Sequence, residues 1–182
     1  FTAAYFDHEG LYCFARQPEA LHWNLAQLAS ALRLISDSEP LVATLEGFPK
    51  AYGTAFTRHF CWRLGIESEG FESDRDLVVA AEKGLAEKTI QIDRFFFDWG
   101  RTENLASPEE NPPGFSEFRA LIADRARTRE PVSGYWQKPE PCSMHIEEVE
   151  AIWTAIAEDD DWTILSQKIN DIRDMGYALR NG

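Results

Sequence analysis

QPEALHWNLAQLASALRLI, residues 17–35, is the stretch that decides the fold. Pro18 suits the first turn of a helix, where its missing N–H is not needed. Large apolar residues then recur at alternating spacings of four and three, which places them on one face of an α-helix: Leu21, Leu25, Leu28, Leu32 and Ile35. Trp23 lies off this stripe, so we expect the helix to contact structure on two sides, as a central helix of a bundle does.

Helix signals recur along the next part of the chain, and strand signals are poor. Residues 1–17 are aromatic and irregular and are expected to form a loop. A short helix is predicted from Ser38 to about Gly47, and a second from Pro49 to a stop at Gly65, which tolerates the left-handed conformation. Two more helices are indicated by a capping-box pattern, Ser73 with Asp76, and by the aromatic run RFFFDW at 94–99.

The C-terminal half alternates between Pro-rich segments and amphipathic segments. Residues 101–115 are predicted to be a surface loop and Ser116 to open a helix, before a Pro/Gly-rich stretch at 131–141. Two further helices follow, the first opened by Ser143 and the second capped by the run Asp159-Asp160-Asp161. Each carries apolar residues at three-four-three spacing: Ile146, Val149, Trp153 and Ile156 in the first, and Trp162, Leu165, Ile169 and Ile172 in the second.

These patterns predict an all-α, multi-helix bundle of about eight helices. Residues 1–182 are interpreted as a single helical domain. Its parts are a loop, core helices, a surface loop and C-terminal helices, at 1–17, 18–100, 101–115 and 116–182.

The composition restricts the partners of the chain. Lys and Arg number 18 against 31 Asp and Glu, a formal net charge of −13. Such a surface repels nucleic acid and anionic membranes, so neither is an expected partner. No apolar run approaches the roughly 20 residues that span a bilayer, and no secretion signal is visible, so we expect a cytoplasmic protein. The first residue is Phe1, which indicates a processed form, a fragment or a recombinant product.

Three cysteines, Cys13, Cys61 and Cys142, are far apart and show no zinc-ligand spacing. They are interpreted as reduced thiols, with a reactive or bridging role left open.

Few residues indicate chemistry. The Gly-rich loops that cradle phosphates and the catalytic and metal motifs of phosphoryl transfer do not occur. Asp7-His8-Glu9 is a cluster of potential metal ligands or an exposed polar turn, and Asp159-Asp160-Asp161 is a cation site or a helix cap. The three histidines predicted to lie within helices are structural residues or general bases: His22, His59 and His145. No catalytic, cofactor-binding or metal-ligating residue is assigned to this chain.

Trp23 and Asn24 are an unusual pair inside a helix, because helix propensity disfavours Asn there. Asn24 either faces solvent or, if buried, must hydrogen-bond a specific group such as a neighbouring loop.

The first 35 residues resemble the selenoprotein O (SelO) family of protein-adenylylating pseudokinases. The resemblance is carried by DHEGLY at 7–12, Gln17-Pro18, WNLA at 23–26, Leu28-Ala29 and Ala31-Leu32. The chain departs from the family pattern at Arg16 and Gln27, where Asn and Arg are usual, and lacks the Cys-containing tail, which puts a redox role in doubt.

The resemblance implies a protein-kinase-like fold, with these helices in the C-lobe. It also implies transfer of AMP from ATP to protein Ser, Thr or Tyr hydroxyls, with Mg²⁺ or Mn²⁺. The nucleotide-binding, catalytic and metal-binding residues of the family lie upstream of the matched segment, so the chain alone is expected to be inactive. Its partners would be the upstream kinase-like lobe of the same protein and protein substrates. The resemblance makes the following residues candidates for scaffold or substrate-side roles: Tyr5, Asp7, His8, Tyr12, Gln17, Trp23 and Asn24.

A second hypothesis fits the acidic surface and the missing motifs equally well. In it the chain is a non-catalytic helical module that binds or regulates a protein partner. The coding sequence upstream of Phe1 distinguishes the two hypotheses, because the enzyme needs a Gly-rich loop, a Lys and an Asn/Asp metal pair there.

Overall fold

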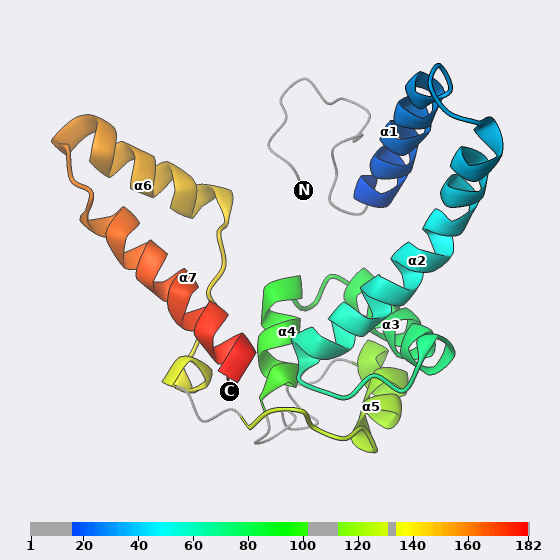
Figure 1. Ribbon diagram of the computed structural model, residues 1–182. Helices are drawn as coiled ribbons and strands as arrows, with labels where there is room; N and C mark the ends of the chain where they lie inside the picture. The colour runs from blue at the N-terminus through cyan, green and yellow to red at the C-terminus, as the bar shows by residue number, and fades with distance from the viewer. Residues whose placement is uncertain (1–15, 102–112, 131–133, 182) are drawn as a thin grey trace. The chain divides into compact units, whose positions relative to one another are not determined.

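The computed structural model describes residues 16–101, 113–130 and 134–181, and in these ranges the chain is helical (Figure 1). The seven α-helices of the described ranges are α1 (Gln17–Leu32), α2 (Ser38–Leu64), α3 (Phe71–Ala86), α4 (Ile92–Gly100), α5 (Ser116–Ala123), α6 (Ile146–Asp159) and α7 (Thr163–Asn181). Two short 3₁₀ turns, η2 (Pro113–Phe115) and η3 (Gly134–Gln137), complete them. The predicted all-α class is confirmed, whereas the kinase-like C-lobe stays a prediction.

The chain divides into two compact units, Phe1–Phe56 and Thr57–Gly182, and α2 runs from the first into the second. The single helical domain that the sequence predicts for residues 1–182 stays a prediction.

In the first unit, α1 starts as the sequence predicts, with Pro18 in its first turn. His22 on α1 stacks on Phe48 of α2, with ring centroids 5.1 Å apart. However, α1 has no buried residue. The prediction of a central bundle helix is therefore wrong for the described part of this chain.

Helix α2 is one helix of 27 residues, where two were predicted to meet at Gly47 and Pro49. Proline costs a helix one backbone hydrogen bond and crowds the preceding turn, but its fixed φ is itself helical. Pro49 is exposed, so water can satisfy the carbonyl that loses its donor. The predicted stop at Gly65 is confirmed: its φ is +67°, and the N–H groups of Gly65 and Ile66 donate to the carbonyls of Trp62 and Cys61.

The main core lies in the second unit and is built on α4. Phe95 is fully buried, and its ring centroid lies 5.6 Å from that of Phe115 and 5.1 Å from that of Phe118. Gly84 of α3 makes room for this packing, because a Cβ there would come within 2.5 Å of the Phe115 ring. The predicted aromatic helix at 94–99 and the helix that begins at Ser116 are confirmed.

The capping box predicted at Ser73 and Asp76 does not form. Helix α3 begins at Phe71, two residues earlier, so Ser73 already lies inside the first turn. The hydroxyl of Ser73 instead accepts a hydrogen bond from Arg125.

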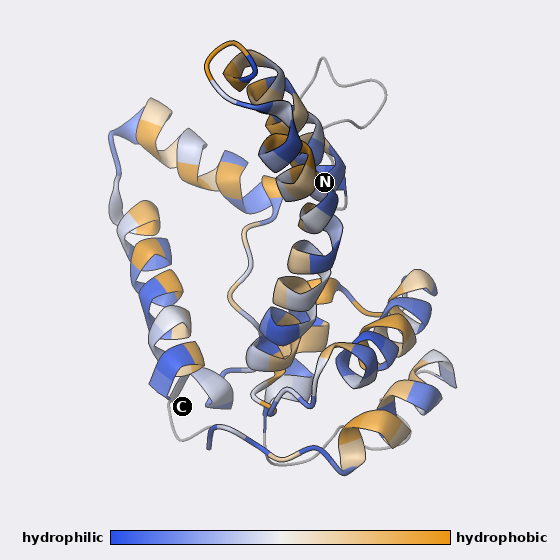
Figure 2. Cartoon of the chain, turned by 45° about the vertical axis from the view of Figure 1, so that its right-hand side comes forward, coloured by the Kyte–Doolittle hydropathy of each residue, from blue (hydrophilic) through white to orange (hydrophobic). Residues whose placement is uncertain are grey.

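Helices α6 and α7 form a hairpin in which hydrophilic and hydrophobic residues alternate (Figure 2). The cap predicted for the last helix is confirmed, because the Asp161 carboxylate accepts the Thr163 N–H at 2.8 Å. Helix α6 begins at Ile146, so His145 is its N-cap residue and does not lie within the helix as predicted.

Candidate functional site

Only some of the candidate residues from the sequence lie within the described ranges. Tyr5, Asp7, His8 and Tyr12 lie outside the described residues, as do Glu9 and Cys13. Gln17, Trp23 and Asn24 lie on α1, and all three are exposed, Trp23 by 63%. Their scaffold or substrate-side role stays a prediction.

The histidines on helices are placed against aromatic rings. His59 of α2 packs edge-on against Trp62, with ring centroids 6.4 Å apart, as His22 packs flat on Phe48. Over the ranges that the structure describes, no group of three or more His, Cys, Asp or Glu side chains is placed to hold a metal ion.

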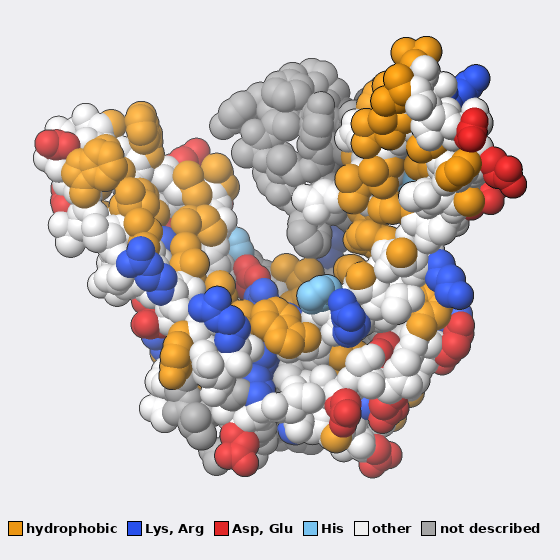
Figure 3. All heavy atoms as spheres, viewed as in Figure 1, with side chains coloured by type: hydrophobic (Ala, Val, Ile, Leu, Met, Phe, Trp, Pro, Cys, Tyr) orange, Lys and Arg blue, Asp and Glu red, His pale blue; other side chains and the backbone are white. Residues whose placement is uncertain are grey.

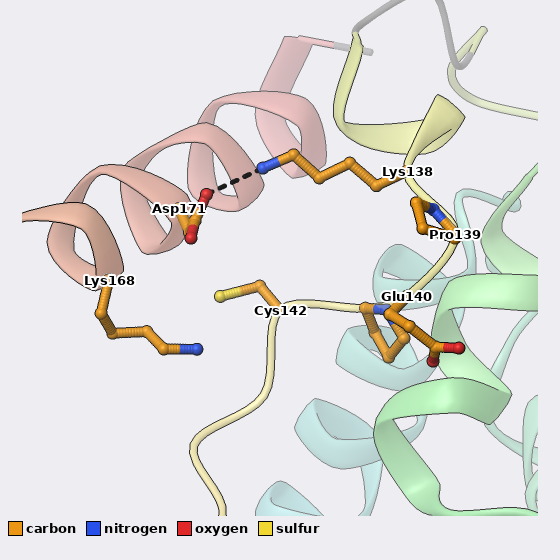
Figure 4. Close-up of a pocket in the computed structure, with 7 residues that line it drawn as sticks. Lys138, Pro139, Glu140, Cys142, Lys168 and Asp171 are labelled. Atoms are coloured by element: carbon orange, nitrogen blue, oxygen red, sulfur yellow. Dashed lines mark hydrogen bonds and ion pairs between the residues drawn. The ribbon is translucent and has the colours of Figure 1, made fainter. Parts of the chain in front are cut away.

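One pocket of about 250 Å³ lies between α7 and the segment that follows η3 (Figure 4). It is lined by Lys138, Pro139, Glu140, Pro141, Cys142, Lys168 and Asp171. The ammonium group of Lys138 lies 2.9 Å from a carboxylate oxygen of Asp171. That of Lys168 donates to the Ser143 carbonyl at 2.7 Å and pairs with Glu148 of α6.

The polar groups of this pocket are used for contacts within the chain. Both lysines are engaged by carboxylates, so neither presents a free charge to a phosphate. Burial raises the pKa of the Cys142 thiol, an effect that the nearby Lys168 opposes. The thiol therefore stays protonated at neutral pH, and the thiolate is the nucleophilic form. The contacts fasten residues 138–143 to α7.

A second polar cluster is buried beside the core. Asp74 is 1% exposed, and its carboxylate pairs with Arg125 at 2.7 Å. It also accepts hydrogen bonds from the Ser68 hydroxyl and the Glu69 N–H. Burial alone would raise the pKa of Asp74, but these hydrogen bonds outweigh it and hold the pKa below its usual value. Burial, reinforced by the neighbouring Asp74, raises the pKa of the Cys61 thiol to about 12, so this thiol stays protonated at neutral pH.

Arginines occupy alternate positions, 125, 127 and 129, of a short segment that makes a β-bridge with Ile66 at Arg127. This segment pairs with residues 65–67, through Glu67 N–H to the Ala126 carbonyl at 2.8 Å and Thr128 N–H to the Gly65 carbonyl at 3.0 Å. Arg127 donates to the carbonyls of Leu64 and Trp99, at 3.0 Å each.

Arg129 donates to the carbonyls of Arg63 at 2.6 Å and Leu179 at 3.1 Å. Its guanidinium lies 5.0 Å from the centre of the Trp136 ring. Burial, reinforced by Arg127 and Arg63, lowers the pKa of Arg129 to about 10, so it remains charged at neutral pH. Arg127 and Arg129 thus supply donors to carbonyls at the ends of α2, α4 and α7, which have none within their own helices.

Sequence reasoning missed these arginines. The signal was present in the alternation of RARTR at 125–129, because a period of two places alternate side chains on one side of an extended chain. Their role is structural, and no substrate contact follows from it.

Comparison with known proteins supplies the family. The family model described as protein adenylyltransferase SelO matches residues 1–173. The chain belongs to the SelO family. The match extends the resemblance found at residues 1–35 to nearly the whole chain.

Curated relatives in the family carry the name protein nucleotidyltransferase YdiU. One from Synechococcus is 28% identical over all of this chain and 42% of its own length. One from Synechocystis is 28% identical over 94% of this chain and 40% of its own length. One from Variovorax paradoxus is 34% identical over 66% of this chain and 23% of its own length. The chain therefore spans at most about two fifths of these relatives. No solved structure matches it at a significant level.

Among the described helices, none combines the length and the apolar character that crossing a membrane requires.

Proposed function

We propose that this chain is the C-terminal helical part of a protein adenylyltransferase, which transfers AMP from ATP to Ser, Thr or Tyr hydroxyls of other proteins. The observation that carries the proposal is the family match over residues 1–173. The name nucleotidyltransferase, which the relatives bear, supports it.

In the described residues no group of three or more His, Cys, Asp or Glu side chains is placed to hold a metal ion, and both lysines of the pocket are paired with carboxylates. We propose that ATP and Mg²⁺ or Mn²⁺ bind an upstream kinase-like lobe and that the 182 residues alone are inactive.

The part played by this chain in the proposal is that of a scaffold. Leu21 and Leu28 belong to the apolar stripe of α1, yet they are 48% and 54% exposed. A helix with an apolar stripe gains stability by burying it against another element. The upstream lobe is proposed to cover this stripe, in a cytoplasmic protein.

Labelled ATP tests the reaction. The longer gene product is incubated with ATP that carries its label in the α-phosphate or in the γ-phosphate, and transfer to protein is measured. We expect α-label to become bound to protein hydroxyls and γ-label not to, with no transfer by residues 1–182 alone. Transfer of the γ-label without the α-label would contradict the proposal.

Recombination of the two parts tests the scaffold role. The upstream lobe, expressed separately, is expected to bind residues 1–182, and Leu28→Glu is expected to weaken that binding about tenfold by placing a charge in an apolar contact. Ser30→Glu is the matched control, because Ser30 is an exposed residue of α1 outside the stripe. Equal effects of the two substitutions would count against a contact through the stripe.

The alternative function is a non-catalytic helical module that binds or regulates a protein. The exposed apolar residues of α6 and α7 favour a binding role for that hairpin. Absence of both labels from protein, together with retained partner binding, would favour this alternative.

A further inference from the structure

The two apolar stripes of the α6–α7 hairpin remain at the surface. In α6, Ile146, Val149 and Trp153 are 42%, 41% and 66% exposed. In the second stripe, which begins just before α7, Trp162, Ile169 and Ile172 are 53%, 39% and 39% exposed. Their three-four spacing is that of residues which face a partner element. In the described chain, that partner is missing from both helices.

The two stripes form one face. Ile152 of α6 and Lys168 of α7 are buried, and Lys168 pairs with Glu148 where the two helices meet. Viewed along each helix from its N-terminus, the stripe is rotated in the same sense away from the buried residue. Because the two helices run in opposite directions through the turn at 160–162, both stripes then lie on the same side of the hairpin. Figure 3 shows hydrophobic side chains gathered over both helices at the left of the view. We call this surface the hairpin face: Ile146, Val149, Trp153, Trp162, Ile169 and Ile172.

The segment that carries the hairpin face is net negative, and its acidic residues gather along α6 and the turn that follows. Residues 143–181 contain nine Asp and Glu against three Lys and Arg. Of these three, Lys168 is buried in its pair with Glu148, and Arg173 and Arg180 are exposed on α7. On α6 itself the exposed charged side chains are all acidic, Glu150 and Asp159 among them, and the turn that follows adds Asp160 and Asp161.

We propose that the hairpin face binds an amphipathic helix with a basic polar side, supplied by a partner protein. The apolar side of that helix would cover the two stripes, as a third helix completes a bundle. Its Lys and Arg residues would lie along α6 and the acidic turn, where they meet complementary charge. The exposed indoles of Trp153 and Trp162 are the side-chain type that most often dominates such contacts. This interaction does not depend on AMP transfer.

A second copy of the chain is a poorer occupant. Two copies that pack through their hairpin faces would bring together two chains that each have a net charge of −13. Like charges opposed across an interface cost binding energy. The basic helix avoids this cost and gains from the same field.

Peptide binding tests the proposal on residues 1–182. The probe is a fluorescent Leu/Lys amphipathic helix of 14 residues, the length of α6, and binding is followed by fluorescence anisotropy. We expect saturable one-to-one binding of this peptide, and binding about tenfold or more weaker for a Leu/Glu peptide of the same pattern. Trp153→Glu is expected to weaken binding of the Leu/Lys peptide about tenfold or more. Glu150→Lys is expected to weaken it in the same direction.

Tyr177→Glu is the matched control. Tyr177 is an aromatic residue of α7 that is 61% exposed, as Trp153 is 66%, but it lies outside the stripe. The control adds the same charge as Trp153→Glu, so it distinguishes peptide binding at the hairpin face from general electrostatic attraction of the peptide. Equal loss from both substitutions, or equal binding of the Leu/Lys and Leu/Glu peptides, would overturn the proposal.

Two further outcomes would assign the face to another occupant and so overturn the proposal. One is self-association of residues 1–182 in sedimentation equilibrium that Trp153→Glu abolishes. The other is loss of peptide binding in the longer gene product, which would mean that the rest of that protein covers the face. Peptide binding by both proteins, with the same loss on Trp153→Glu, supports a separate partner.

Discussion

Replacing Asp74 by Ala is expected to destabilise the chain severely, because it removes the buried carboxylate partner of Arg125 and leaves only the 52% exposed Glu69 as its ion-pair partner. The Arg125 side chain is 4% exposed, and Asp74 accepts one of its hydrogen bonds at 2.7 Å. Removing one member of a buried ion pair costs about 3–5 kcal/mol. A domain of ordinary stability has about 5–15 kcal/mol in total, so the variant is expected to unfold at much lower urea concentration.

The chain offers a control pair with the same geometry in solvent. Lys83 and Glu117 also approach to 2.7 Å, but their side chains are 59% and 54% exposed. An exposed pair contributes about 0–1 kcal/mol, because water screens it. Lys83→Ala should therefore shift the urea midpoint far less than Asp74→Ala, as measured by circular dichroism. Equal shifts would refute the view that burial decides the value of these ion pairs.

The same cluster predicts how stability depends on pH. The pKa of Asp74 is lowered in the folded chain, whereas an unfolded Asp has a pKa of about 3.9. The folded state therefore binds fewer protons, and the contribution of Asp74 is complete above about pH 4 and is lost as the pH falls through the lower, folded pKa. Urea unfolding at about pH 6 and pH 3 should show this loss in the parent chain, and a smaller one in Asp74→Ala. An identical pH dependence in the two proteins would be inconsistent with a lowered pKa.

Two further comparisons test the packing and the thiols. Gly84→Ala should destabilise the chain by about 1–3 kcal/mol, because its Cβ would meet the Phe115 ring at 2.5 Å. Gly47→Ala, whose Cβ would have nothing within 4 Å, should instead stabilise α2 by about 0.5–1 kcal/mol. Urea unfolding measures both changes. Iodoacetamide should alkylate the half-buried Cys142 of the folded chain faster than Cys61, which is fully buried with a pKa of about 12. Peptide mass spectrometry measures both sites, and faster labelling of Cys61 would contradict the structure.

Local signals in the sequence predicted many helices well. The stop at Gly65, the aromatic helix α4, the start of α5 at Ser116 and the cap at Asp161 all depend on residues within one or two turns of each other. Such signals act through backbone conformation and short-range hydrogen bonds, which sequence spacing encodes directly.

The errors occur where distant residues decide. Ser73 has the sequence pattern of a capping box, but its hydroxyl accepts a hydrogen bond from Arg125, 52 residues away. The carbonyls at the end of α2 are satisfied from Arg127 and Arg129, which no local rule connects to them. A buried polar group must find a partner, but the sequence does not show which residue supplies it.

The candidate site shows the same division between pattern and partner. Spacing of three and four marks the side of a helix that should be buried, and it does so equally for α3, whose Leu77 and Ala81 are fully buried, and for α6, whose Trp153 is 66% exposed. Periodicity therefore reports that a contact exists without reporting what makes it. A structure shows which element makes the contact, because it distinguishes stripes that are covered within the chain from those that are not. The hairpin face is inferred from that difference: its pattern is that of a helix contact, and among the described residues no element makes the contact.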